Sequence, residues 1–258
     1  MISFKKKNIR VFEQFPKLKL IPLDRFPPHV LIIPDGNGRW ASKIHRLPIV
    51  GHRKGAGVLK KALRTLNSLP ISIVTIWGFS ADNWKRSKGE INGIMAVLEE
   101  TIGGMRKELM QKNIRFMHLG RKDRIPKSLK KVIEEMEELT KNNKGKKFAA
   151  AIDFGGVDQE MRIMRKIQTL PKKTKISLEL LEKLRDSEGI ITPADLIIRT
   201  SGEKRTSDLG WLAQNAEFYS IDKLLPDCSI KDFVEALLDY SKRERRFGGR
   251  PTYGHKAV

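Results

Sequence analysis

Short apolar runs alternate along the chain with longer segments in which apolar residues recur every three or four positions. Short runs rich in β-branched residues are typical of buried strands, and the longer spacing is typical of amphipathic helices. The pattern predicts strands at 29–34, 71–79, 114–120, 147–154, 194–200 and 216–221. It predicts helices at 56–69, 91–113, 128–141, 156–169, 177–185 and 230–242.

Regular alternation of strands and helices favours an α/β fold with a mainly parallel sheet. The 258 residues suffice for one domain with a full core. We therefore expect a single domain with a central, mainly parallel six-stranded sheet flanked by helices. The expected organisation is a basic N-terminal segment over 1–28, the domain itself over 29–250 and a C-terminal tail over 251–258.

Polar or glycine-rich segments follow four of the predicted strands. Ligands of open parallel sheets bind beyond the carboxyl ends of the strands, so these segments are the first place to look for chemistry. They lie at 35–40, 80–86, 155–156 and 199–207, and three of them carry arginine. The sequence therefore predicts a ligand site for an anion at this edge of the sheet.

The first segment, DGNGRW at 35–40, combines a carboxylate, two glycines and an arginine. Glycines let backbone N–H groups face an anion, and Arg39 can bond a phosphate with two parallel hydrogen bonds. Asp35 fits beside a phosphate if a divalent metal bridges the two, and Mg²⁺ commonly binds one or two carboxylates plus phosphate oxygens. Taken alone, a solvated turn explains the segment equally well. Its spacing matches neither a P-loop nor a dinucleotide fingerprint.

The second segment, GFSADNWKRS at 78–87, offers Ser80, Asn83, Trp84 and Arg86. These side chains suit a lid over a polar ligand. The alternative is a helix entry with a serine cap and a packed Trp84, and for this segment alone that alternative is favoured.

The third segment, IRTSGEKRTS at 198–207, places Arg199, Arg205 and Ser207 around a glycine. Two arginines and several hydroxyls suit a second anion pocket, whereas surface charge is the alternative. Two phosphate-type sites and one metal carboxylate together indicate a group transfer in which a diphosphate departs. Metal and arginine charges would then supply most of the catalysis.

The net charge is strongly positive, 51 − 30 = +21. Such a charge suits nucleic acid, an acidic membrane surface or anionic substrates. We expect no nucleic-acid partner, because no recognition module is visible and many lysines occupy scattered helical positions. No run of eighteen apolar residues predicts a membrane span. The single cysteine, Cys228, suits a reducing compartment, so we expect a cytoplasmic protein, with possible peripheral membrane contact.

Most of the chain resembles the cis-prenyltransferases, the isoprenyl transferase family that includes undecaprenyl diphosphate synthase. The resemblance rests on seven blocks, which follow the family's order from about residue 29 to 250. They are HVLIIPDGNGRWA, GHRKGA, GFSADNWKR, DFGG, DLIIRTSGEKRTS, AEFY and RERRFGG. Each block is moderately specific, and the set is strong.

The resemblance implies a transferase that condenses isopentenyl diphosphate with an allylic diphosphate, such as farnesyl diphosphate. The product would be a Z-polyprenyl diphosphate, the cofactor Mg²⁺ and the assembly a homodimer. The domain at 29–250 would be the catalytic domain, and an apolar tunnel would hold the growing chain. Residues 91–109 would form a tunnel wall, and Gly78 would leave room for a medium or long product.

Roles can be carried over from the family motif by motif. Asp35 would assist departure of the allylic diphosphate through Mg²⁺, with Glu217 as a further metal residue linked to the dimer. The catalytic set would be Asp35, Asn37 and Asn83. The substrate-binding set would be Gly36, Gly38, Arg39, Trp40, His52, Ser80, Trp84, Arg86, Arg199, Arg205 and Ser207. A structural histidine is an equally good interpretation of His52.

The sequence departs from the family pattern at a few positions. Pro48 stands where a phosphate-binding arginine is usual, with Arg46 two residues earlier, and Val157 stands where arginine follows DFGG. The changes bear on primer preference and efficiency. A short-chain or irregular prenyl diphosphate synthase is one alternative. A non-catalytic member that supports a partner is another, although such a protein should have lost Asp35 and the phosphate arginines.

Overall fold

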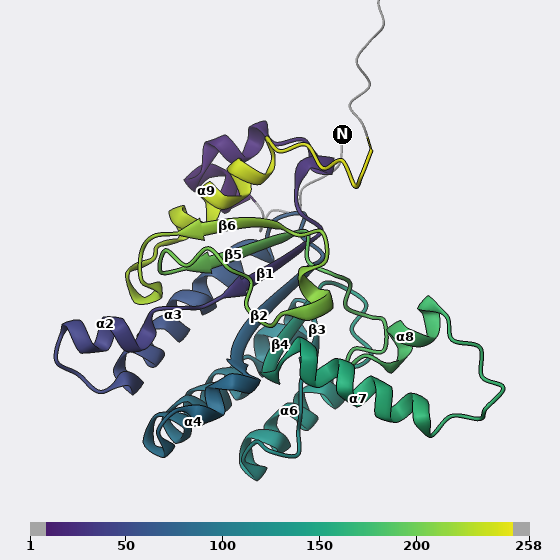
Figure 1. Ribbon diagram of the computed structural model, residues 1–258. Helices are drawn as coiled ribbons and strands as arrows, with labels where there is room; N and C mark the ends of the chain where they lie inside the picture. The colour runs from purple at the N-terminus through teal and green to yellow at the C-terminus, as the bar shows by residue number, and fades with distance from the viewer. Residues whose placement is uncertain (1–8, 250–258) are drawn as a thin grey trace, which may run out of the picture.

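The computed structural model describes residues 9–249, which form an α/β domain around a six-stranded, all-parallel sheet (Figure 1). The strands are β1 (His29–Ile33), β2 (Ile73–Ser80), β3 (Arg115–Leu119), β4 (Lys147–Phe154), β5 (Leu196–Thr200) and β6 (Glu217–Ile221). They lie side by side in the order β3-β4-β2-β1-β5-β6. The predicted fold class and strand number are therefore confirmed, with every pair of neighbouring strands parallel.

Helices connect the strands and cover the sheet. They are α1 (Ile9–Gln14), α2 (Asn37–Lys43), α3 (Pro48–Leu66), α4 (Lys88–Gly103), α5 (Arg106–Gln111), α6 (Lys127–Thr140), α7 (Gly156–Gln168), α8 (Leu178–Leu184) and α9 (Ile230–Tyr240). Helices α3, α4, α6 and α9 contribute to the larger core on one face. The smaller core on the other face includes the 3-10 helix Gly210–Ala213, which α7 contacts.

Strand β1 occupies the middle of the sheet and is buried on both faces. Val30 and Ile32 belong to the larger core, whereas Leu31 and Ile33 belong to the smaller one. This explains why the strand is continuously apolar. Because β1 lies between β2 and β5, the carboxyl ends of these three strands meet at one edge, where a crevice for ligands is expected.

Two predicted helices differ from the observed ones at their boundaries. Helix α3 begins at Pro48, well before the predicted start at 56, because proline is favoured in a first turn and the glycines that follow do not end the helix. The helix predicted over 91–113 is two helices, α4 and α5. They separate at Gly103 and Gly104, residues with low helix propensity.

The N-terminal segment packs against the domain where the structure describes it. Phe12, Leu18 and Phe26 are buried in the larger core. Residues 1–8 and the predicted tail at 251–258 lie outside the described residues. Over residues 9–249, none of the helices has the length and apolar character needed to cross a bilayer.

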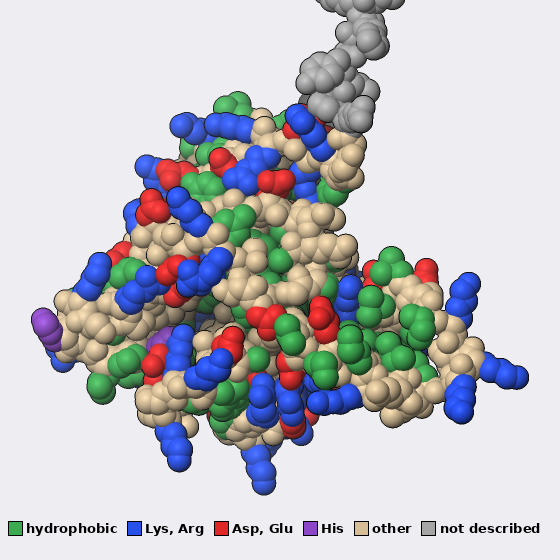
Figure 2. Space-filling model, viewed as in Figure 1, with side chains coloured by type: hydrophobic (Ala, Val, Ile, Leu, Met, Phe, Trp, Pro, Cys, Tyr) green, Lys and Arg blue, Asp and Glu red, His purple; other side chains and the backbone are tan. Residues whose placement is uncertain are grey.

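Lysine and arginine side chains are spread over the face shown in Figure 2, with aspartate and glutamate between them. Many of these cations form exposed ion pairs on or between helices, such as Arg53 with Glu100 and Arg106 with Glu135. This arrangement favours the interpretation of many basic residues as a solvated surface.

Candidate active site

A cavity of about 260 Å³ opens beyond the carboxyl ends of β1, β2 and β5. We call it the charged cavity. It brings together side chains from three separate segments of the sequence. Six predicted site residues line it: Asp35, Ser80, Asn83, Arg86, Arg199 and Ser207. Parallel strand ends thus collect the polar segments as the sequence predicts.

An ion pair between Asp35 and Arg199 lies at the centre of the charged cavity. Arg199 Nη2 donates to Asp35 Oδ2 at 2.9 Å, and the Gly36 N–H donates to Asp35 Oδ1 at 2.7 Å. Burial disfavours the charged carboxylate, but the hydrogen bond and charge of Arg199 outweigh burial and lower the pKa of Asp35. Asp35 is therefore ionised at neutral pH, with 30% of its side chain exposed to the cavity.

Arg199 also connects the first and third polar segments. Its Nη1 atom donates to the Arg205 carbonyl at 2.6 Å and to Ser207 Oγ at 3.0 Å. Its Nε atom is buried with no hydrogen-bond partner among the described residues. Arg205 itself points its guanidinium to Glu203 and is exposed. Arg199 is thus the buried arginine of the pair, and Arg205 is available to a ligand from outside.

Helix α2 presents Arg39 beside the charged cavity. Gly36 precedes the helix with φ +99°, a conformation that favours glycine, and a Cβ there would lie 2.9 Å from Leu224. Arg39 Nη2 lies 3.3 Å from Asp35 Oδ1 and also contacts Ser201 and Glu203. The tight turn therefore aims an exposed guanidinium back at the Asp35 carboxylate.

The segment after β2 forms a one-turn helix entry. The Ser80 N–H donates to Asn83 Oδ1 at 3.0 Å, and the Ser80 side chain accepts from the Asn83 backbone in a capping box. Trp84 packs edge-on against Phe79 at 5.1 Å and donates to Asp153 at 2.8 Å. The segment thus forms a helix entry with a serine cap and a packed Trp84, which is the alternative given above. Ser80 and Asn83 nevertheless line the charged cavity.

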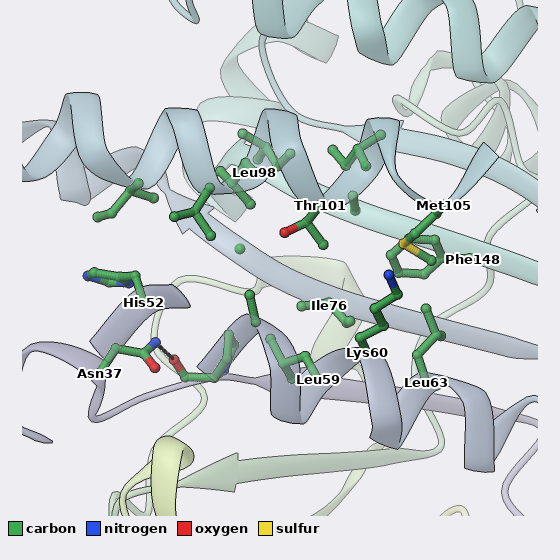
Figure 3. A pocket seen from close by; sticks show the side chains of 18 residues that line it. Asn37, His52, Leu59, Lys60, Leu63, Ile76, Leu98, Thr101, Met105 and Phe148 are labelled. Atoms are coloured by element: carbon green, nitrogen blue, oxygen red, sulfur yellow. Dashed lines mark hydrogen bonds between the residues drawn. The ribbon is translucent and has the colours of Figure 1, made fainter. Parts of the chain in front are cut away.

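A second, apolar cavity of about 90 Å³ lies between α3 and α4 (Figure 3). We call it the apolar cavity. Leu59 and Leu63 line it from α3, and Leu98 lines it from α4. Gly78 lies in its wall, where an added Cβ would stand 3.0 Å from Leu98. This cavity occupies the place of the predicted tunnel, with residues 91–109 as one wall.

Consecutive residues at the end of β1 line the two cavities. Pro34 lines the apolar cavity and Asp35, the next residue, lines the charged cavity. Asn37 and His52 lie together at one end of the apolar cavity (Figure 3). Asn37 Oδ1 and His52 Nε2 are buried and lack hydrogen-bond partners in the described structure. A mainly apolar chamber with Asn37 and His52 at the end next to a carboxylate suits a ligand with an anionic head and an apolar tail.

Two glycines of GHRKGAG serve close packing. A Cβ on Gly51 would lie 2.0 Å from the Asn37 carbonyl oxygen, and one on Gly55 would lie 2.1 Å from Asn37 Oδ1. Only glycine lets α3 approach α2 this closely. The packing of these two glycines therefore positions Asn37.

His52 is linked to the charged cavity through Glu90. Arg86 Nη1 donates to Glu90 Oε1 at 2.9 Å, and the same oxygen lies 3.6 Å from His52 Nε2. Burial above all, and then the charge of Arg86, lower the pKa of His52, against the opposing effect of Glu90. The ring is therefore neutral at physiological pH.

Glu217 and Trp40 lie away from the Asp35 carboxylate. Glu217 opens β6 opposite Leu196, whereas Ile33 pairs with Arg199, so Glu217 is at least ~10 Å further down the sheet. Its carboxylate pairs with Arg243 at 2.9 Å. Within one chain Asp35 and Glu217 cannot ligate the same ion. Trp40 Nε1 donates to Asp227 at 2.7 Å, and Lys54 stacks over its ring.

The remaining predicted positions have simple placements. Gly38 lies in the first turn of α2, with open space where a Cβ would point. Pro48 begins α3, Arg46 is exposed in the turn before it, and Val157 is exposed at the start of α7. The structure offers no buried anion contact for Arg46.

Several polar residues of the site were not singled out from the sequence. Asp208 lines the charged cavity, and Glu90 joins Arg86 to His52. Asp153 is fully buried, with Trp84 and Arg124 as partners. Asp153 is the next-to-last residue of β4, so the rule that pointed to the other strand ends could have found it.

Asp35 is the carboxylate best placed to hold a divalent metal. No cluster of three or more metal-ligating side chains occurs within residues 9–249. An ionised, partly exposed carboxylate without such a cluster suits Mg²⁺, which keeps waters and takes further oxygens from bound phosphates. The residues present therefore fit a metal that arrives with a diphosphate.

Comparison with known proteins identifies relatives along most of the chain. Residues 33–248 match the family model described as "Putative undecaprenyl diphosphate synthase". The isoprenyl transferase of Aquifex pyrophilus is 40% identical over 225 residues, covering 87% of this chain and 96% of that protein. The (2E,6E)-farnesyl-diphosphate specific ditrans,polycis-undecaprenyl-diphosphate synthase of Pasteurella multocida is 34% identical over 237 residues, covering 89% and 99%.

A solved structure shares the fold. Lavandulyl diphosphate synthase from Lavandula x intermedia, in complex with dimethylallyl diphosphate, aligns with a TM-score of 0.81 and 33% sequence identity. The alignment covers 87% of this chain and 99% of that one.

Proposed function

Since this chain belongs to the undecaprenyl diphosphate synthase family and is a prenyl transferase, we propose that it condenses isopentenyl diphosphate with an allylic diphosphate such as farnesyl diphosphate. The product would be a Z-polyprenyl diphosphate. The observation that carries the proposal is the junction at Pro34 and Asp35, where a cavity with arginines opens beside a cavity with apolar walls. A prenyl diphosphate has the matching anionic head and apolar tail.

The allylic diphosphate would bind at the start of α2. Arg39 offers two parallel donors, and the first turn of α2 adds backbone N–H groups. Its prenyl tail would enter between α3 and α4, against the apolar side chains of Leu59, Leu63 and Leu98. Isopentenyl diphosphate would bind to Arg199, Arg205 and Ser207, across Asp35 from the allylic site.

Asp35 would hold a divalent metal. Its charge and its partial exposure suit Mg²⁺. Bound there, Mg²⁺ would neutralise charge on the departing diphosphate. Asp35 can serve because Arg199 lowers its pKa and fixes one carboxylate oxygen. Ser80, Asn83 and Arg86 would line the reacting region, with Asn37 and His52 at the mouth of the apolar cavity.

A homodimer would give Glu217 and the RERRFGG segment a role that one chain alone cannot. Within the chain Glu217 pairs with Arg243, and Arg245 pairs with Asp195, so both lie at the opposite end of the sheet from Asp35. We propose that they act toward a partner subunit. A peripheral contact with the cytoplasmic membrane surface would suit release of an apolar product.

A short-chain or irregular prenyl diphosphate synthase is the second candidate. The similarity to a lavandulyl diphosphate synthase bound to dimethylallyl diphosphate supports it. A non-catalytic role is less well supported, because Asp35, Arg39, Arg199 and Arg205 are all present.

The test is an assay of the purified chain with isopentenyl diphosphate, Mg²⁺ and, in parallel, dimethylallyl, geranyl or farnesyl diphosphate. Mass spectrometry of the products should show successive additions of five-carbon units, and omission of Mg²⁺ or addition of EDTA should abolish them. A chain that makes no prenyl product from any of the three primers would contradict the proposal. Coupling of two dimethylallyl diphosphates would favour the second candidate.

A further inference from the structure

The apolar cavity contains one cationic side chain. Lys60 lines it from α3, between Leu59 and Leu63. In Figure 3 its side chain extends from α3 toward Met105 and Phe148, at the end away from Asn37 and His52. An ammonium group is unexpected in the lining of a cavity whose other lining side chains are almost all apolar.

Among the residues that the structure describes, the Lys60 ammonium has no anionic partner. Other lysines of the chain form ion pairs, such as Lys85 with Asp82 and Lys112 with Glu108, but no ion pair of Lys60 occurs within residues 9–249. Thr101 is the polar side chain that faces it from α4 (Figure 3). Lys60 is half-buried, so water must solvate its charge through the cavity or the gap between the helices.

The position of Lys60 sets a distance from the reacting end. His52 and Lys60 are eight residues apart on one face of α3, which corresponds to a rise of about 12 Å. An isoprene unit adds four bonds to a chain, or roughly 5 Å when extended, by comparison with the three bonds of an extended residue. A prenyl tail would therefore pass His52 by about two to three units before it reaches Lys60.

We propose that Lys60 limits product length, an inference that rests on the proposed prenyl transfer. A tail that grows past Lys60 displaces the water around an unpaired ammonium. The penalty for this desolvation is comparable with the gain from burying another five-carbon unit, so a longer chain binds no more tightly and is released instead of being extended. Chains that end near Lys60 keep the ammonium wet and are released. Lys60 would thus be a specificity-determining residue, and wild-type products would be short to medium in length.

Three variants test the proposal. Lys60→Met keeps the length of the side chain and removes its charge, Lys60→Arg keeps the charge, and Lys61→Met is the matched control on the exposed face of α3. Each purified variant is assayed with isopentenyl diphosphate, Mg²⁺ and farnesyl diphosphate, and the product distribution is read by mass spectrometry. A thermal melt of each variant verifies folding.

The expected result is a shift of the main Lys60→Met product by at least one five-carbon unit toward longer chains. Lys60→Arg and Lys61→Met should keep the wild-type distribution. Identical distributions for wild type and Lys60→Met would overturn the length limit alone, because the wild type would still transfer prenyl groups. A wild type without any product would overturn the proposed function and this inference together. If Lys60→Met does not fold, Lys60→Leu provides the same comparison.

Discussion

The charged cavity and the apolar cavity are adjacent but are built in opposite ways. In the charged cavity directed hydrogen bonds and ion pairs hold the main groups, as in the 2.9 Å pair of Asp35 and Arg199. The apolar cavity is a space left between the faces of α3 and α4, bounded by side chains that resemble any core. The chemistry of the site therefore depends on a few hydrogen-bond donors. Its selectivity depends on the volume of the apolar cavity and on the few polar side chains in the walls of that cavity.

The largest effect is expected from the charged cavity. Asp35→Ala removes the carboxylate that would hold the metal, so kcat should fall by about a thousandfold, the magnitude typical for loss of a central electrostatic group. The measurement is steady-state turnover of isopentenyl diphosphate. Asp35→Asn, which keeps the shape and one acceptor for Arg199, should be nearly as inactive.

A melting temperature close to wild type would show that Asp35→Asn acts on chemistry. Near-normal turnover in both variants would remove Asp35 from the mechanism and with it the distinction between the two cavities.

The sheet, by contrast with the charged cavity, should be sensitive to mild acid. Burial lowers the pKa of His29 and of His118 to about 4, whereas an unfolded histidine titrates near 6.5. Between these values only the unfolded chain gains protons, so stability present above pH 6.5 is lost as pH falls. From pH 7 to pH 5 the loss should be about 2 kcal/mol for each histidine.

Urea unfolding at the two pH values measures this loss. His118→Gln keeps a donor for the Ile152 carbonyl and should remove about half of the pH dependence, whatever its effect on stability at pH 7. Asp35 stays ionised over this range because its pKa is lowered. A pH-independent unfolding free energy would show that these histidines are not buried as described.

A smaller effect is expected at the contact between α2 and α3, where Asn37 lines the apolar cavity. Gly55→Ala places a methyl group 2.1 Å from Asn37 Oδ1, so overpacking should cost about 1–3 kcal/mol and displace Asn37. Gly57→Ala is the control, because a Cβ there meets nothing within 4 Å and alanine favours helix by about 1 kcal/mol. Chemical denaturation should give a lower free energy of unfolding than wild type for Gly55→Ala and a higher one for Gly57→Ala. Equal free energies of unfolding for the two variants would refute the close approach of α2 and α3.

The smallest effect is expected at Trp40. Its indole donates to Asp227 and lies under Lys54, outside both cavities, so Trp40→Phe should change kcat/KM by less than about threefold and stability by about 1 kcal/mol. Steady-state kinetics of the purified variant measures the change in kcat/KM. A tenfold loss of kcat/KM would return Trp40 to the substrate-binding set predicted from the sequence.

Much of the fold could be predicted because periodicity reports burial. The continuous apolar character of HVLII and the β-branched run in β2 place both strands in the middle of a parallel sheet. The boundaries of the helices were harder to predict from the sequence. Pro48 and two glycines look like a loop in sequence, and only the packing of α3 on Asn37 shows why a helix tolerates them.

The site divides in the same way. Asp35, Arg199 and Ser207 could be predicted, since each follows a strand and carries a charged or polar group. Lys60 could not, because it sits in a helix whose other lysines face solvent, and its position becomes informative only when α4 is placed opposite. Glu217 shows the opposite case. Its motif is visible in the sequence, but its distance from Asp35 depends on the direction and register of the strands.

The most direct test of the account is a crystal structure with Mg²⁺, isopentenyl diphosphate and a non-hydrolysable farnesyl thiodiphosphate. One ligand should span both cavities, with its diphosphate at Arg39 and Asp35 and its tail between α3 and α4 in contact with Leu59 and Leu98. The second diphosphate should lie on Arg199 and Ser207. A tail outside the apolar cavity, or a diphosphate bound away from Asp35, would contradict the claim that the two cavities form one prenyl transfer site.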